Sequence, residues 1–159
     1  MSVFKLSKNR EELIENIRKY IAISEEGCEL YRAFKMEVRD ADYEAGWIEF
    51  THVVNEFEKN RYGNMHGGAI TAILDTSMGL AAFELGTGNA SPTMDIQVNF
   101  IKGAHLGDEL VIRAEVISAG KHSAVMRSVM SRNGETVAIA TATNRIYSLT
   151  VPASLPFAK

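Results

Sequence analysis

The sequence HGGAITAILDTSMGLAAFELG occupies residues 66–86 and decides what the rest of the chain can form around it. From Gly68 to Leu85 it is the longest apolar, alanine-rich segment of the chain, and it contains no proline. Gly86 follows it in the position of a helix C-cap, so we expect a buried central helix over residues 68–85. A helix that is apolar nearly all round must be wrapped, and a curled antiparallel sheet can do so.

Strand patterns lie on both sides of this helix. Residues 93–101 alternate between apolar and polar side chains, which is typical of a half-buried strand. The turn signals Ala119-Gly120 and Asn133-Gly134 separate later strands, and the second is a strong hairpin signal. The last strand carries small residues on one face, which lets a helix lie close: Ala138, Ala140 and Ala142. The strands expected are residues 32–40, 47–54, 93–101, 110–118, 122–132 and 135–147.

The beginning of the chain reads as a further helix. Four apolar residues recur there at helical spacing, with Ser7 as the expected N-cap: Leu13, Ile14, Ile17 and Ile21. We therefore divide the chain into an N-terminal helical extension, one α+β domain and a C-terminal tail, at residues 1–30, 31–150 and 151–159. The absence of repeats and of a Pro-rich or Ser-rich linker argues against two loosely joined domains.

Composition excludes several classes of function. The chain has 159 residues and a formal net charge of -3, with no basic run, so nucleic acid is not an expected partner. The single cysteine, Cys28, permits no intrachain disulfide, which suits a reducing compartment. No signal-peptide core and no apolar run near the ~20 residues of a membrane span is present. We expect a cytoplasmic protein without a membrane segment.

Two features of the central segment require an explanation: the triplet His66-Gly67-Gly68 before the helix, and Asp75 within it. A carboxylate in such an apolar segment is costly to bury unless it is paired or used. The structural interpretation is that Asp75 bonds a neighbouring hydroxyl or caps a backbone group. In the same interpretation, the glycines form a turn and His66 packs against it.

The functional interpretation is acyl transfer to water. A helix N-terminus offers free N–H groups, and glycine there lets a substrate carbonyl come close to the backbone. Such donors stabilise the oxyanion that forms when a thioester is attacked, and a partly desolvated Asp activates the attacking water. A carboxylate is a weak base, so a thioester with its good leaving group suits it better than an amide.

The spacing of these residues makes a resemblance specific. His66 lies six positions after Asn60, Asp75 nine positions after His66, and Thr93 18 positions after Asp75. In this respect the chain resembles the HGG-type hotdog thioesterases, the phenylacetate-pathway or PaaI-like acyl-CoA thioesterase group. The run MDIQVNFIKGAHLGDELVIRAEVISAGKHSAV, residues 94–125, resembles its following strands and its Gly-Lys loop. The resemblance covers residues 47–147, although Ala104-His105 stands where many relatives carry proline.

The resemblance implies an α+β hotdog fold, with an antiparallel curved sheet wrapped around the long central helix. It implies that Asp75 activates water or attacks directly, with Thr93 holding that water. The Gly67 N–H and Asn60 would polarise the carbonyl, while His66 orients the turn or the substrate. It further implies a homodimer or homotetramer with sites between subunits and no cofactor or metal. The residues expected to contact the substrate are Gly68, Lys121, His122 and Ser123.

Several alternatives stay open at this stage. Lys121 either contacts a phosphate of coenzyme A or is a solvated turn lysine. The resemblance implies an acyl-CoA substrate, with either an aryl or a medium-chain acyl group. A hotdog hydratase or dehydratase is one rival activity, but neither an Asp-x-Asn-Pro-x-His nor a His-Phe-Pro motif occurs. A non-catalytic acyl-CoA sensor is another. No Gly-x-Ser-x-Gly motif supports a serine hydrolase, and Cys28 is read as a bystander.

Overall fold

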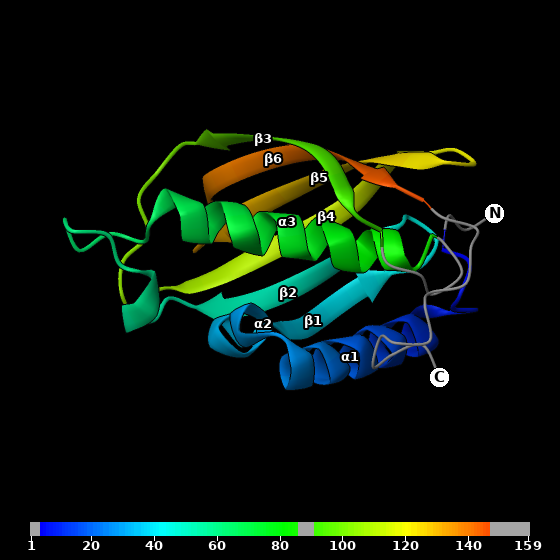
Figure 1. The fold of residues 1–159 in the computed structure, drawn as a ribbon, viewed down its shortest axis with the longest axis horizontal. Helices are drawn as coiled ribbons and strands as arrows, with labels where there is room; N and C mark the ends of the chain where they lie inside the picture. The colour runs from blue at the N-terminus through cyan, green and yellow to red at the C-terminus, as the bar shows by residue number, and fades with distance from the viewer. Residues whose placement is uncertain (1–3, 86–90, 147–159) are drawn as a thin grey trace.

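One long helix lies against a six-stranded sheet in the computed structural model, which describes residues 4–85 and 91–146 (Figure 1). The helix is α3 (Gly67–Phe83), and the strands run antiparallel in the order β1-β2-β4-β5-β6-β3. This is the hotdog arrangement, so the α+β class expected from the sequence is confirmed. The strand bounds are β1 (Glu37–Asp42), β2 (Trp47–Val53), β3 (Thr93–Phe100), β4 (Glu109–Ala119), β5 (Ser123–Arg132) and β6 (Glu135–Arg145).

Helix α3 is buried because apolar side chains surround it on most sides. Ile73, Leu74 and Met78 are fully shielded from solvent. The small face predicted for the last strand is confirmed, since its three alanines, Ala138, Ala140 and Ala142, are buried on β6. The helix begins one residue earlier than expected and ends at Phe83 instead of Leu85. The expected C-cap, Gly86, lies outside the described residues.

The hairpin between β5 and β6 forms at the predicted dipeptide. Asn133 and Gly134 are the two turn residues, with φ angles of 50° and 80°. A two-residue turn whose backbone twist matches its strands requires positive φ at both positions, which asparagine and glycine adopt most readily. This turn fixes the register that brings the alanines of β6 toward α3.

The N-terminal segment forms α1 (Arg10–Gly27), and its four predicted apolar residues are buried as expected: Leu13, Ile14, Ile17 and Ile21. The predicted N-cap was wrong, because Asn9 caps the helix by accepting from the Glu12 N–H at 2.9 Å. Ser7 instead donates its hydroxyl to Glu84 at 2.8 Å, at the end of α3. Burial raises the pKa of the Glu84 carboxyl, and the hydrogen bonds from Ser7 oppose that shift.

The strand expected near residues 32–40 begins later than predicted. A short helix, α2 (Glu29–Phe34), takes its first residues, and β1 starts at Glu37. Lys35 adopts a left-handed conformation with φ of 46°, and its N–H bonds the Tyr31 carbonyl to close the helix. A lysine rarely adopts this conformation, so local propensity gave no sign of the turn.

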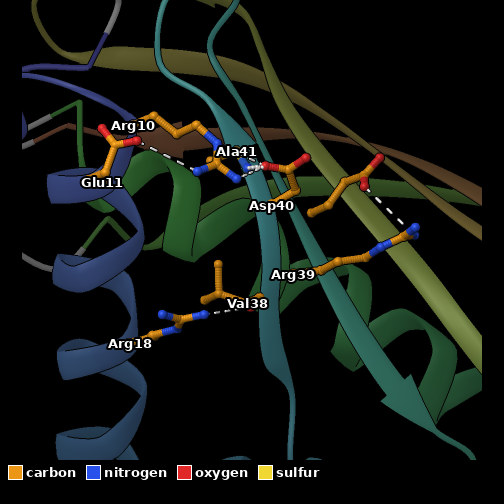
Figure 2. A network of polar contacts seen from close by, with 8 residues as sticks. Arg10, Glu11, Arg18, Val38, Arg39, Asp40 and Ala41 are labelled. Carbon is orange, nitrogen blue, oxygen red and sulfur yellow. Dashed lines mark hydrogen bonds and ion pairs between the residues drawn. The ribbon is translucent and has the colours of Figure 1, made fainter.

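Polar contacts attach α1 to the edge strand β1, as Figure 2 shows. Arg10 donates to the Asp40 carboxylate through Nη2 at 2.5 Å and Nε at 3.0 Å. Arg18 reaches the Val38 carbonyl at 3.5 Å.

The opposite edge strand, β3, exposes large apolar side chains near its ends, Met94, Phe100 and Ile101. Among the described residues, no helix combines the length and apolarity that crossing a membrane would demand.

Candidate functional site

The start of α3 is organised by the side chain of His66. Its Nδ1 accepts the Gly68 N–H at 2.9 Å, which makes His66 the N-cap of the helix. The backbone N–H of Gly68 is therefore occupied. The N–H of Gly67 has no hydrogen-bond acceptor within residues 4–85 and 91–146, so it is free to meet a substrate oxygen. His66 therefore holds the first turn of α3, and the Gly67 N–H is left unpaired among the described residues.

Phe100, at the end of β3, lies against Gly67. A Cβ atom at position 67 would sit 3.3 Å from the Cζ of this ring, which is tighter than most real contacts. Glycine at position 67 therefore lets the Phe100 ring lie close, and a larger residue would have to displace the end of this ring. The Phe100 side chain remains 57% exposed, so its outer face is open to a ligand or to another chain. The sequence analysis did not single out Phe100, because its alternation pattern assigned it only to a strand.

Asn60 lies in the loop that leads to this helix start. Its Oδ1 accepts the N–H of Tyr62 at 2.9 Å and the N–H of Asn64 at 3.2 Å. The oxygen therefore shapes the loop, and the amide NH2 is the part of the side chain that remains to donate. The side chain of Asn60 therefore has its oxygen occupied by the loop, while its amide hydrogens have no acceptor among the described residues.

A buried pair anchors the same loop to the sheet. The Nε2 of His52 lies 2.9 Å from Oε2 of Glu58, and both side chains are almost completely shielded. His52 Nδ1 donates to the Phe34 carbonyl at 2.6 Å, while the Glu58 carbonyl accepts the His66 N–H at 2.7 Å. The sequence analysis missed this pair. The available signal was the capping box, with Asn55 three residues before Glu58.

Asp75 and Thr93 are brought together as the spacing predicted. The Thr93 hydroxyl donates to Oδ1 of Asp75 with an Oγ1 to Oδ1 distance of 2.6 Å, and both residues are half-buried. The structural interpretation, in which Asp75 bonds a neighbouring hydroxyl, is therefore also supported. Asp75 keeps its second oxygen, Oδ2, for another partner. Behind Thr93 lies the buried amide of Asn144, 3.3 Å from Oγ1, which the sequence analysis did not identify.

The two groups of candidate residues are separated within one chain. Gly67 and Asp75 are eight residues apart on α3, which at about 1.5 Å per residue places them about 12 Å apart along the axis. Asn60 and His66 belong with Gly67, and Thr93 belongs with Asp75. One chain therefore does not bring the donors and the carboxylate onto the same carbonyl group.

The three remaining candidates form the exposed turn between β4 and β5: Lys121, His122 and Ser123. The Ser123 carbonyl accepts the Gly120 N–H at 2.8 Å, which closes the turn. Ser123 pairs with Arg145 on β6, one residue from Asn144, which pairs with Thr93. The turn therefore lies at the Thr93 end of the sheet, at the tip of the yellow hairpin in Figure 1.

Helix α3 packs closely against the N-terminal segment, with no room for a water molecule between them. The residues at this contact are Ile21, Tyr31, Phe34, Met36, Thr76 and Leu80. Burial raises the pKa of the Tyr31 phenol, and the neighbouring Tyr20, Cys28 and Asp75 add to that shift. Tyr31 therefore stays neutral at ordinary pH.

Within the described part of the chain, no three His, Cys, Asp or Glu side chains gather as metal ligands would.

Comparison with known proteins agrees with this geometry. Residues 62–139 match the family model of the Thioesterase superfamily. The mouse acyl-coenzyme A thioesterase 13 is 28% identical over 68 residues, which are 43% of this chain and 49% of that protein. The match thus spans about half the length of this curated relative.

Two solved structures extend the comparison to most of the domain. A hypothetical thioesterase from Streptococcus pneumoniae, solved with coenzyme A, has a TM-score of 0.64 and 29% identity, covering 70% of this chain and 87% of its own. A phenylacetic acid degradation-related protein from Ralstonia eutropha has a TM-score of 0.71 and 26% identity, covering 80% and 99%. The resemblance to the phenylacetate-pathway thioesterases is confirmed.

Proposed function

We propose that the protein hydrolyses an acyl-CoA thioester to the free acid and coenzyme A. The observation that carries this proposal is the half-buried Asp75 carboxylate, whose Oδ1 is held by Thr93 while Oδ2 remains available. A positioned carboxylate of this kind serves as a general base for water. The coenzyme A in the Streptococcus pneumoniae relative supports the choice of substrate.

The reaction needs no group beyond the chain and water. Oδ2 of Asp75 takes a proton as the water oxygen bonds the carbonyl carbon, and the developing oxyanion accepts from the Gly67 N–H and the Asn60 amide. The C–S bond then breaks, and the thiolate of coenzyme A takes the proton from Asp75. Thr93 donates to Asp75 and so fixes the carboxylate, and a lone pair of its oxygen is left to hold the water.

The separation along α3 leads us to place the site between two chains. Asn60 and Gly67 of one subunit would face Asp75 of its partner, with the open edges of two β3 strands paired antiparallel. This pairing satisfies exposed strand edges and covers Met94, Phe100 and Ile101. We propose a homodimer as the active unit and a tetramer of two such dimers as the assembled state.

Assembly is tested by light scattering together with activity. The wild-type protein should elute as a dimer or tetramer at concentrations where it is active. Gln97→Arg, at an exposed residue of the edge strand β3, should disturb this edge and release inactive monomer. The matched control is an arginine at Thr141 on β6, an exposed site on a strand inside the sheet. A wild-type protein that is purely monomeric and fully active would contradict the two-chain site.

The remaining candidates are assigned to substrate binding. We propose that Lys121 attracts a phosphate of coenzyme A, with His122 and Ser123 beside it in the exposed turn. Gly68 lets the His66 ring lie close to the helix start, because a Cβ at position 68 would lie 3.0 Å from Nδ1 of His66. We propose that the acyl group is aryl or medium-chain.

The proposed function is tested by following free thiol release from a panel of aryl and straight-chain acyl-CoAs. Hydrolysis of at least one of them, without any added cofactor, is the expected result. A chelator should leave the rate unchanged. Tight binding of every acyl-CoA without thiol release would instead identify a sensor, and addition of water across an enoyl-CoA without thiol release would identify a hydratase.

A further inference from the structure

The side chain of Asn144 lies directly behind the Asp75–Thr93 pair, on β6. It is completely buried, and its Nδ2 donates to the Thr93 Oγ1 at 3.3 Å and to the Ser91 carbonyl at 3.0 Å. We propose that Asn144 is a positioning residue for thioester hydrolysis, which holds the Thr93 hydroxyl in the orientation that donates to Asp75. The inference rests on the proposed function and adds a residue to it.

The direction of the hydrogen bonds follows from the chemistry of the groups. An ionised carboxylate only accepts, so the short contact between Thr93 and Asp75 requires that the hydroxyl donates. The lone pairs of Oγ1 are then left for a donor, which the amide of Asn144 supplies. Its other N–H meets the Ser91 carbonyl, so a flipped amide would bring two oxygens together. The Asn144 amide therefore donates to the Thr93 hydroxyl, and this hydroxyl donates to the Asp75 carboxylate.

The fold alone does not call for an amide at this position. The preceding residues on the same face of β6 are Ala138, Ala140 and Ala142, and a further small apolar residue would continue that face. Oδ1 of Asn144 is buried and has no hydrogen-bond partner among residues 4–85 and 91–146, which costs stability. The hydrogen bond to Thr93 explains why a polar residue occupies this buried position despite the loss of stability.

The consequence for the reaction is a carboxylate with one defined free oxygen. Without Asn144, the Thr93 side chain can rotate between staggered rotamers and leave Asp75 without its partner for part of the time. Hydrogen-bonded chains strengthen one another, so loss of the first link weakens the second. Asn144 is shielded from the substrate, so its loss should lower kcat and leave KM unchanged.

A double-mutant cycle tests this coupling. Asn144→Ala is expected to lower kcat for thiol release by roughly tenfold, with KM within about twofold of wild type. Thr93→Val, which keeps the branched shape but lacks the hydroxyl, should lower kcat at least as much. The double variant should match Thr93→Val alone, because Asn144 acts through the missing hydroxyl. An equal further loss in the Thr93→Val background would overturn the proposal, as would a wild-type kcat for Asn144→Ala.

A matched control separates this effect from general loss of buried polar contacts. Ser128 on β5 and Ser77 on α3 are fully buried and share a hydrogen bond of 2.8 Å, away from the Asp75 carboxylate. Ser128→Ala should lower the melting temperature and leave kcat unchanged. If Asn144→Ala does not fold, Asn144→Ser keeps one donor and enters the cycle instead, with a smaller expected loss.

A readout independent of activity completes the test. Scalar couplings in NMR spectra report the χ1 rotamer of Thr93, which should be single in the wild type and averaged in the Asn144 variant. A single rotamer in both proteins would overturn the proposal even if the wild type releases thiol. Averaging in the variant would support it even if no acyl-CoA is hydrolysed, in which case the proposed function fails by itself.

Discussion

Replacing Asp75 with asparagine is expected to lower acyl-CoA turnover by ~100-fold or more, because the variant lacks the carboxylate that takes the proton from water. The amide has nearly the same shape, and its oxygen can still accept from the Thr93 hydroxyl, which contacts Oδ1 in the structure. The site should therefore stay assembled. Removal of a half-buried charge should leave the melting temperature unchanged or raise it.

Thiol release and thermal melting must be measured on the same Asp75→Asn preparation. A protein that melts normally and has lost turnover supports the role of Asp75 as base or nucleophile. Normal melting with a wild-type rate would remove Asp75 from the mechanism. Loss of both the fold and the activity would instead favour the structural interpretation of this carboxylate.

Replacement of Asn60 should have an effect of similar size, ~100-fold in turnover, if its NH2 group donates to the oxyanion. The structure shows that alanine alone is an ambiguous test, because Oδ1 of Asn60 also holds the loop through Tyr62 and Asn64. Asn60→Asp is the better variant. It keeps an oxygen for both backbone N–H groups, whereas the donor is replaced by a second oxygen whose negative charge also repels the oxyanion.

The two Asn60 variants should therefore differ in stability and agree in activity. Asn60→Ala should melt earlier, with each lost loop hydrogen bond contributing about 1 kcal/mol, whereas Asn60→Asp should melt near the wild type. Turnover should fall in both. An Asn60→Asp enzyme with unchanged turnover would show that Asn60 only shapes the loop.

Much of the fold could be predicted because its signals are local. A short stretch of sequence was enough to predict each of three elements. These are the apolar helix α3, the alternating strand at residues 93–101 and the turn at Asn133-Gly134. The contact between Asp75 and Thr93 was also predictable, although it spans 18 positions, because a resemblance in spacing supplied it.

The features that were missed depend on partners far apart in sequence. Asn144 contacts Thr93 across 51 positions, and nothing near it in the chain distinguishes it from a polar residue at the end of a strand. The pair of His52 and Glu58 is close in sequence, but its burial depends on Phe34 packing from α2. The end of α2, and with it the start of β1, was predicted wrongly for a local reason, the left-handed conformation of Lys35.

The central claim is an acyl-CoA hydrolase site assembled from two chains, and mixed dimers test it most directly. One chain carries Asn60→Asp, the other carries Asp75→Asn, and dimers with one of each are purified through two different tags. If Asn60 faces the partner's carboxylate, each mixed dimer contains one intact site and one doubly altered site. Thiol release should then recover from ~100-fold below wild type in the parents to about half of the wild-type rate. Mixed dimers no more active than their parents would contradict the account.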